Sequence, residues 1–297
     1  FEAWYRAGWA PKLPAAPGWE RLDARGLVDA RAFPEVVALA SFHRSGFVRE
    51  QAVTLLSAID DGFELPFLLI RANDWVDPVH ALALRALDER LTVAKAAAWA
   101  QSLGLIEHLG TVTLRRRREL EKLGARVEAL MRNAAARPVL ADAVAHGSLD
   151  VRRAALEITL RLPVDAESGA IVLSASDDAD PCIALRSAKA LLRRADIDDV
   201  TLERLAAHRS GETRAGALER WSATGRLSID RLREALFDES RRVRETARWV
   251  LASSPSTSLD VATIYREALE RSEARELLAA LRGLTEVGGS NDVPRFL

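Results

Sequence analysis

The sequence has little cysteine and no long apolar segment. A single cysteine, Cys182, stands among its 297 residues, which excludes an internal disulfide and a cysteine-rich metal site. No apolar run approaches the length of a membrane span. No basic segment followed by an apolar one opens the chain, as a secretory signal would. The lone cysteine fits a reducing compartment, so we expect a cytoplasmic protein with no membrane partner.

The sequence motifs of common enzymes are also missing. We find no Walker-type phosphate loop, no paired-glycine fingerprint, no His-Glu-x-x-His and no Gly-x-Ser-x-Gly. Cys182 follows Pro181 at a predicted helix start, where a thiolate would be favoured, but no histidine can be assigned to it. We therefore predict no catalytic residue, no metal ligand and no cofactor.

Positive and negative charges nearly balance, with a net charge of −1 and a pI of about 6.6. A nucleic-acid-binding domain usually has a basic face and a high pI. Only residues 111–163 carry a clear excess of positive charge, with 11 basic and 6 acidic side chains. This segment includes Arg115-Arg-Arg-Arg118. This run is either a solvated helix start relieved by pairs such as Arg117–Glu121, or a surface for an acidic partner or a phosphate backbone. The second interpretation has support because cations oppose the dipole at a helix N-terminus.

The chain does contain a recurring helical pattern, which is clearest in Asp238–Ala252. The apolar residues of this stretch fall at i, i+4, i+7 and i+8 and are Val243, Ala247, Val250 and Leu251. This spacing places them on one face of an α-helix. Residues 229–237 form a second short helix before it. A helix pair this small cannot bury its own apolar face, so it must stack on copies of itself.

Similar spacing recurs through most of the chain. The first stripe positions of eight predicted helix pairs hold Val48, Val79, Leu123, Val151, Ile183, Thr213, Val243 and Ala274, of which only Thr213 is polar. Most steps between them are 30 to 32 residues. The third unit, about 93–133, is stretched. We expect its first helix to run from Val93 to Leu109 and its second to continue from Arg115 to Met131.

Two further positions repeat with the helices. Five residues before the first stripe position, in every repeat except the one at Leu123, lies the turn position, which holds His43, Asp74, His146, Asp178, His208, Asp238 and Leu269. One residue after the first stripe position lies the arginine position, which holds Arg49, His80, Arg152, Ala184, Arg214, Arg244 and Arg275. We expect the histidines to bond turn backbone as the aspartates would, because stacked helices lie about 8–10 Å apart and an ion needs ligands at about 2 Å. We expect the arginines to pair with turn aspartates of adjacent repeats, although an anion-binding ladder is the alternative.

The order Asp, four residues, Val-Arg and an alanine-rich helix resembles the HEAT repeat of the armadillo-like and PBS-lyase-like solenoids. Asp74–His80, Asp178–Ile183 and Asp238–Arg244 carry the resemblance. It implies an all-α fold, a right-handed α-solenoid of about eight stacked antiparallel helix pairs. Such arrays serve mostly as interaction scaffolds, whereas minorities bind nucleic acid, act as bilin lyases or excise alkylated bases. Histidine at alternate turn positions, the long third repeat and Leu269 in the last one depart from the family pattern.

We therefore expect three parts in the chain. Residues 1–30, rich in aromatics and proline, form an N-terminal cap over the first repeat, or else a segment that docks on a partner. Residues 31–286 form the HEAT-like array, and residues 287–297 form a polar tail that frays.

The predicted function is a non-catalytic scaffold that binds a protein partner in a groove lined by second helices. Outward-facing positions of those helices and the arginine run supply the candidate contacts, which are Arg85, Arg115, Arg116, Arg117, Arg118, Arg153, Lys189, Glu245 and Trp249. Exposed Trp and Arg dominate interface energies, so Trp249 is the foremost candidate unless it packs against the last repeat. The alternatives are nucleic-acid binding through Arg115–Arg118, and a lyase or DNA glycosylase in which Trp221, Trp249 and Glu245 form the site.

Overall fold

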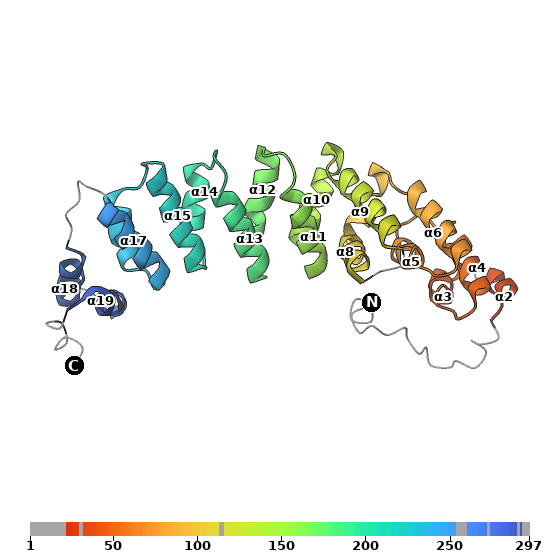
Figure 1. The fold of residues 1–297 in the computed structure, drawn as a ribbon, viewed down its shortest axis with the longest axis horizontal. Helices are drawn as coiled ribbons and strands as arrows, with labels where there is room; N and C mark the ends of the chain where they lie inside the picture. Colours follow the sequence, from red (N-terminus) through yellow and green to blue (C-terminus); the bar gives the residue numbers. More distant parts are fainter. Residues whose placement is uncertain are drawn as a thin grey trace. The chain divides into compact units, whose positions relative to one another are not determined.

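The computed structural model describes residues 22–29, 32–112, 116–253, 260–271, 274–289 and 292. These residues form eighteen α-helices, α2 to α19, and contain no strand (Figure 1). The predicted all-α fold is therefore confirmed. None of the described helices has the length and apolar character needed to cross a bilayer. Most of the predicted N-terminal cap, Arg115, and residues 290, 291 and 293–297 of the predicted tail lie outside the described residues.

The chain divides into two compact units, residues 1–163 and 164–297. The helices of the first unit are α2 (Ala24–Asp29), α3 (Pro34–Ala40), α4 (Gly46–Leu56), α5 (Leu65–Arg71), α6 (Asp77–Glu89), α7 (Ala96–Gln101), α8 (Leu103–Val112), α9 (Arg117–Met131), α10 (Arg137–His146) and α11 (Leu149–Thr159). Short 3-10 helices precede α7 at Val93–Lys95 and α10 at Ala134–Ala136. Within this unit α4 packs on α2, α3 and α6, and α5 packs on α6.

The stretched third repeat contains one helix more than the sequence predicted. The expected continuous helix from Val93 to Leu109 is wrong, because the chain breaks at Ser102 into α7 and α8. The break lets α10 pack on α7 while α11 packs on α8. Gly104 allows this close approach, since a Cβ there would lie 2.8 Å from the Cβ of Asp150 on α11. The second predicted helix is α9, which packs on α8 with its predicted apolar stripe buried.

The helices of the second unit are α12 (Ala166–Ala175), α13 (Pro181–Leu192), α14 (Asp199–Ala206), α15 (Gly211–Ala223), α16 (Ile229–Leu236), α17 (Arg241–Ser253), α18 (Val261–Arg271) and α19 (Ala274–Val287). Consecutive helices pack in pairs, and the second helices pack on one another, α13 on α15 and α15 on α17. Side chains cap several of the first turns, as at α14, where Asp198 accepts a hydrogen bond of 2.7 Å from the Thr201 N–H. The apolar residues of α17 that defined the repeat are all buried.

The last helix pair docks on the preceding one through an aromatic side chain. The fully buried Tyr265 of α18 donates a hydrogen bond of 2.9 Å to the carbonyl oxygen of Leu236, and its ring meets Phe237 edge-on at 5.6 Å. Gly283 of α19 lies directly against the Tyr265 ring, where any Cβ would clash. This glycine therefore lets α19 cover the ring.

Candidate functional site

In five of the seven repeats, the side chain at the turn position fixes the turn that joins the two helices of a pair. The carboxylate Oδ1 atoms of Asp74, Asp178 and Asp238 each accept a hydrogen bond of 2.7–2.9 Å from the backbone N–H two residues later. In His43 and His208 the ring atom Nδ1 accepts the same bond at 3.1 and 2.9 Å. Because a ring nitrogen that accepts carries no proton, the neutral ring holds its proton on Nε2. Both rings are buried in this structural role, as the sequence predicted.

His146 departs from this pattern and is exposed. It forms the end of α10, which only Gly147 and Ser148 separate from α11. The short connection replaces the usual turn. Among the described residues, no group of three His, Cys, Asp or Glu side chains is placed to hold a metal ion.

The arginine position joins neighbouring repeats. In the first unit the guanidinium of Arg49 bonds both carboxylate oxygens of Asp74, at 2.8 and 3.0 Å, and donates from Nη1 to the carbonyl oxygens of His43 and Arg44. In the second unit Arg214 and Asp238 repeat the bidentate pair at 2.9 and 2.7 Å. Two rungs of the predicted repeat-to-repeat ladder are therefore present, and their arginines are engaged in structural contacts.

The last rung of the ladder has a different acceptor. Leu269 occupies the turn position of the final repeat, so Arg244 pairs instead with Glu286 near the end of α19. Arg248 contacts the same carboxylate at 2.8 Å. Burial acts to raise the pKa of Glu286, but the hydrogen bonds and charges of the two arginines outweigh it and hold the pKa below its ordinary value of 4.5.

Structural pairs also neutralise much of the predicted arginine run. Arg116 is largely buried and forms an ion pair with Asp77 of α6. Arg117 pairs with Glu121 at 2.8 Å, which is the i,i+4 contact expected from the sequence. Arg118 is exposed. Of the other first-unit candidates, Arg85 on α6 and Arg153 on α11 are exposed as well.

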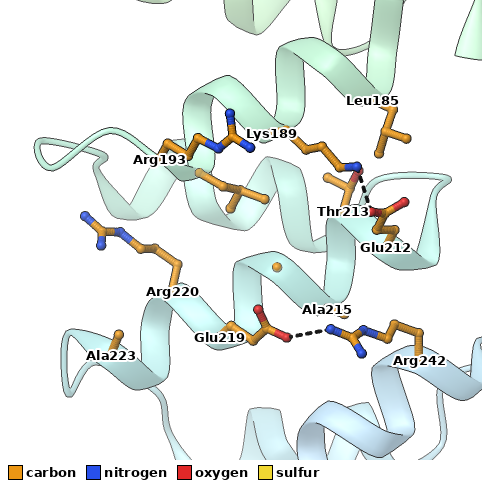
Figure 2. A pocket seen from close by; sticks show the side chains of 12 residues that line it. Leu185, Lys189, Arg193, Glu212, Thr213, Ala215, Glu219, Arg220, Ala223 and Arg242 are labelled. Carbon is orange, nitrogen blue, oxygen red and sulfur yellow. Dashed lines mark hydrogen bonds and ion pairs between the residues drawn. The ribbon is translucent and has the colours of Figure 1, made fainter. Parts of the chain in front are cut away.

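The second unit contains an open groove of about 800 Å³ on the face formed by α13, α15 and α17. Its lining residues are Leu185, Lys189, Leu192, Arg193, Glu212, Thr213, Ala215, Gly216, Glu219, Arg220, Ala223 and Arg242. We call it the α13–α15–α17 groove (Figure 2). Its floor contains the small residues Ala215 and Gly216. Leu185 and Leu192 add apolar surface from α13.

Two ion pairs cross this groove. Lys189 of α13 contacts Glu212 of α15 at 2.8 Å, and Arg242 of α17 contacts Glu219 of α15 at 3.3 Å (Figure 2). All four side chains are about half exposed. Exposed pairs of this kind contribute little to stability, so they are available to exchange partners.

The predicted contacts of the second unit lie on or beside this face. Lys189 lines the groove, Glu245 of α17 pairs with Arg241 at 2.7 Å, and the Trp249 side chain is 64% exposed. Trp249 occupies the position of α17 that corresponds to Lys189 in α13 and Glu219 in α15. It therefore presents an aromatic surface from the same side of the second helices.

Trp221 and Trp249, the two tryptophans of the predicted glycosylase site, lie in different environments. Trp221 is buried, with its indole N–H donating to Asp199 at 3.2 Å and the Arg231 guanidinium over its ring. It is a core residue, whereas Trp249 is exposed. The predicted grouping of Trp221, Trp249 and Glu245 at one surface is wrong, because Trp221 is buried in the core.

Sequence reasoning missed several groove residues, namely Arg193, Glu212, Arg220 and Arg242. They lie at the ends of the second helices, outside the positions that the sequence predicted to face outward. No family model matches the chain, and no curated protein matches it significantly.

Proposed function

We propose that the chain is a HEAT-like right-handed α-solenoid of about eight helix pairs that binds a protein partner and performs no chemistry itself. The observation that carries this proposal is the α13–α15–α17 groove, whose lining combines exposed charges of both signs with apolar residues. The Arg–Asp pairs support the HEAT-like assignment, because in each unit one pair joins the arginine position of a repeat to the turn position of the next.

The charge distribution favours a protein over a nucleic acid. A phosphate-binding track is expected to be uniformly basic, whereas Glu212 and Glu219 line the groove beside its cations. The exposed Trp249 adds the residue type that most often anchors protein interfaces. Arg116 and Arg117 of the rival basic run already pair with carboxylates.

Site-specific photocrosslinking in cells tests this proposal. We expect a photoreactive phenylalanine analogue at Lys189 or Trp249 to give protein adducts that survive nuclease treatment. The same analogue at Val200, which is 78% exposed on α14 and outside the groove lining, is the control and should give none of these adducts. Adducts that form equally at Val200 would contradict the proposal.

A gel-shift series at increasing salt addresses the nucleic-acid alternative. If the chain is a protein scaffold, it should bind duplex DNA and RNA only weakly and without sequence preference. Tight binding that falls steeply with salt, and that weakens when Arg116, Arg117 and Arg118 are neutralised together, would favour the alternative.

A further inference from the structure

One end of the α13–α15–α17 groove carries positive charge that the carboxylates of the groove do not match. Four cationic and two anionic side chains line it. Both carboxylates, Glu212 and Glu219, are already paired across the groove. The two remaining cations, Arg193 and Arg220, lie at the end marked by Ala223 (Figure 2).

Neither of these arginines has a carboxylate partner among the residues that the structure describes. Arg193 follows the last turn of α13 and is exposed. Arg220 donates from Nη2 to the carbonyl oxygens of Arg194 and Ala195, at 2.8 and 3.4 Å. These bonds hold its guanidinium beside the end of α13 and leave its charge uncompensated. A guanidinium presents a planar set of donors that matches a carboxylate.

The floor next to this end accepts apolar side chains. Leu185 and Leu192 of α13 line the groove, and Leu192 lies over Gly216 of α15. A Cβ at position 216 would be only 2.6 Å from the Leu192 Cδ1 atom, so a larger residue would displace the leucine and alter the floor. The groove therefore combines an apolar floor with one cationic end.

We propose that the partner binds this groove through an acidic segment. Its apolar side chains lie on the floor, and one or two Asp or Glu side chains bind Arg193 and Arg220. Charge complementarity selects the segment, because the other charges of the groove already neutralise one another. This inference rests on the proposed protein-binding function and specifies the chemistry of the partner.

Selection of random dodecapeptides displayed on phage against the full chain tests the proposal. Peptides eluted from the wild-type protein should be enriched in Asp and Glu next to apolar residues. With Arg193→Glu, which alters an exposed side chain, the acidic enrichment should disappear. The matched control is Arg233→Glu, the same charge reversal at an exposed residue of α16 outside the groove, and it should leave the selected sequences unchanged.

The best selected peptide then gives a quantitative readout by fluorescence anisotropy. Its affinity should fall about tenfold in Arg193→Glu, because attraction becomes repulsion, and should be unchanged in Arg233→Glu. The proposal is overturned if the selected peptides show no acidic enrichment, or if Arg193→Glu gives the same enrichment as the wild type. It is also overturned if duplex DNA binds the wild type tightly and Arg193→Glu abolishes this binding. If photocrosslinking at Lys189 captures a protein while the selected peptides show no acidic preference, the acidic-segment inference fails and the scaffold function stands.

Discussion

The buried ion pair between Arg49 and Asp74 gives the most direct test of the arginine ladder. In Asp74→Ala, Arg49 and Arg71 lose their hydrogen bonds to the carboxylate, and the Val76 N–H loses the acceptor that fixes the turn. The Asp74 side chain is 1% exposed and that of Arg49 is 5% exposed, so water cannot replace the lost contacts. Leaving a buried charge without its partner costs about 3–5 kcal/mol. We expect a loss of this size in the free energy of unfolding of the first unit.

A second variant separates the charge from the turn. Asp74→Asn keeps an oxygen that accepts from the Val76 N–H but removes the negative charge, so its cost should be smaller, about 1.5–3 kcal/mol. Asp88→Ala is the control, because Asp88 pairs with Arg126 and both side chains are about half exposed. Loss of such a surface pair should cost less than about 1 kcal/mol.

The measurement is urea unfolding followed by far-UV circular dichroism, with hydrogen exchange of peptides from α4 to α6 to assign the loss to this region.

The pH dependence of stability provides a further check. Burial acts to raise the pKa of Asp74, but hydrogen bonds from Arg49 and Val76 and the charges of the arginines outweigh it, so the pKa lies below its ordinary value of 3.8. The carboxylate therefore contributes stability at pH values above 3.8, and this contribution is lost as the pH falls through the lower value. If Asp74→Ala costs no more than Asp88→Ala, the ladder does not stabilise the fold and our reasoning is wrong.

Three other substitutions follow from the second unit. The Ser187 hydroxyl is buried in α13 with no hydrogen-bond partner, so Ser187→Ala should raise the unfolding free energy by about 1 kcal/mol in urea titrations, and a decrease would show that the hydroxyl is satisfied. Because the pKa of Glu286 is lowered, the docking of α18 and α19 should weaken as the pH falls below 4.5. Hydrogen exchange of these two helices should no longer depend on pH in this way in Glu286→Gln. A pH profile of exchange that is unchanged in Glu286→Gln would exclude Glu286 as the source of the pH dependence. Trp221→Ala should cost about 3–5 kcal/mol in thermal unfolding, whereas Trp249→Ala should cost much less, and equal costs would place both rings in the core.

Much of the local structure was predictable because it depends on residues close together in the sequence. The apolar stripe of α17, the N-cap at Asp198 and the Arg117–Glu121 pair all follow from helical spacing. The two tryptophans show that helical spacing also predicts which side chains are buried and which are exposed. Trp221 lies eight residues after Thr213, a spacing that places it in the core. Trp249 lies six residues after Val243, a spacing that places it on the outward face.

The features that the sequence did not predict depend on which helices become neighbours. Helical periodicity continues from α7 into α8, and only the packing of α11 against Gly104 accounts for a break at Ser102. The groove also combines residues from three helices. Arg193 and Arg220 belong to one end of it because α13 packs on α15. A helix-by-helix reading treats them as unrelated charges at two helix ends.

The contact between each ladder arginine and its own turn constrains where the chain tolerates insertions. The Nη1 atoms of Arg49, Arg214 and Arg244 each donate to the carbonyl oxygen six residues earlier. One added residue inside this interval would move the carbonyl out of reach and misalign the bond to the adjacent repeat. Connections between helix pairs differ in length, eight residues between α4 and α5 but five between α15 and α16. Some of them are held by arginines as well, because Arg90 bonds the carbonyl oxygens of Ser57 and Ile59, and Arg220 bonds those of Arg194 and Ala195. Insertions should therefore be selected against in the six-residue interval before each ladder arginine.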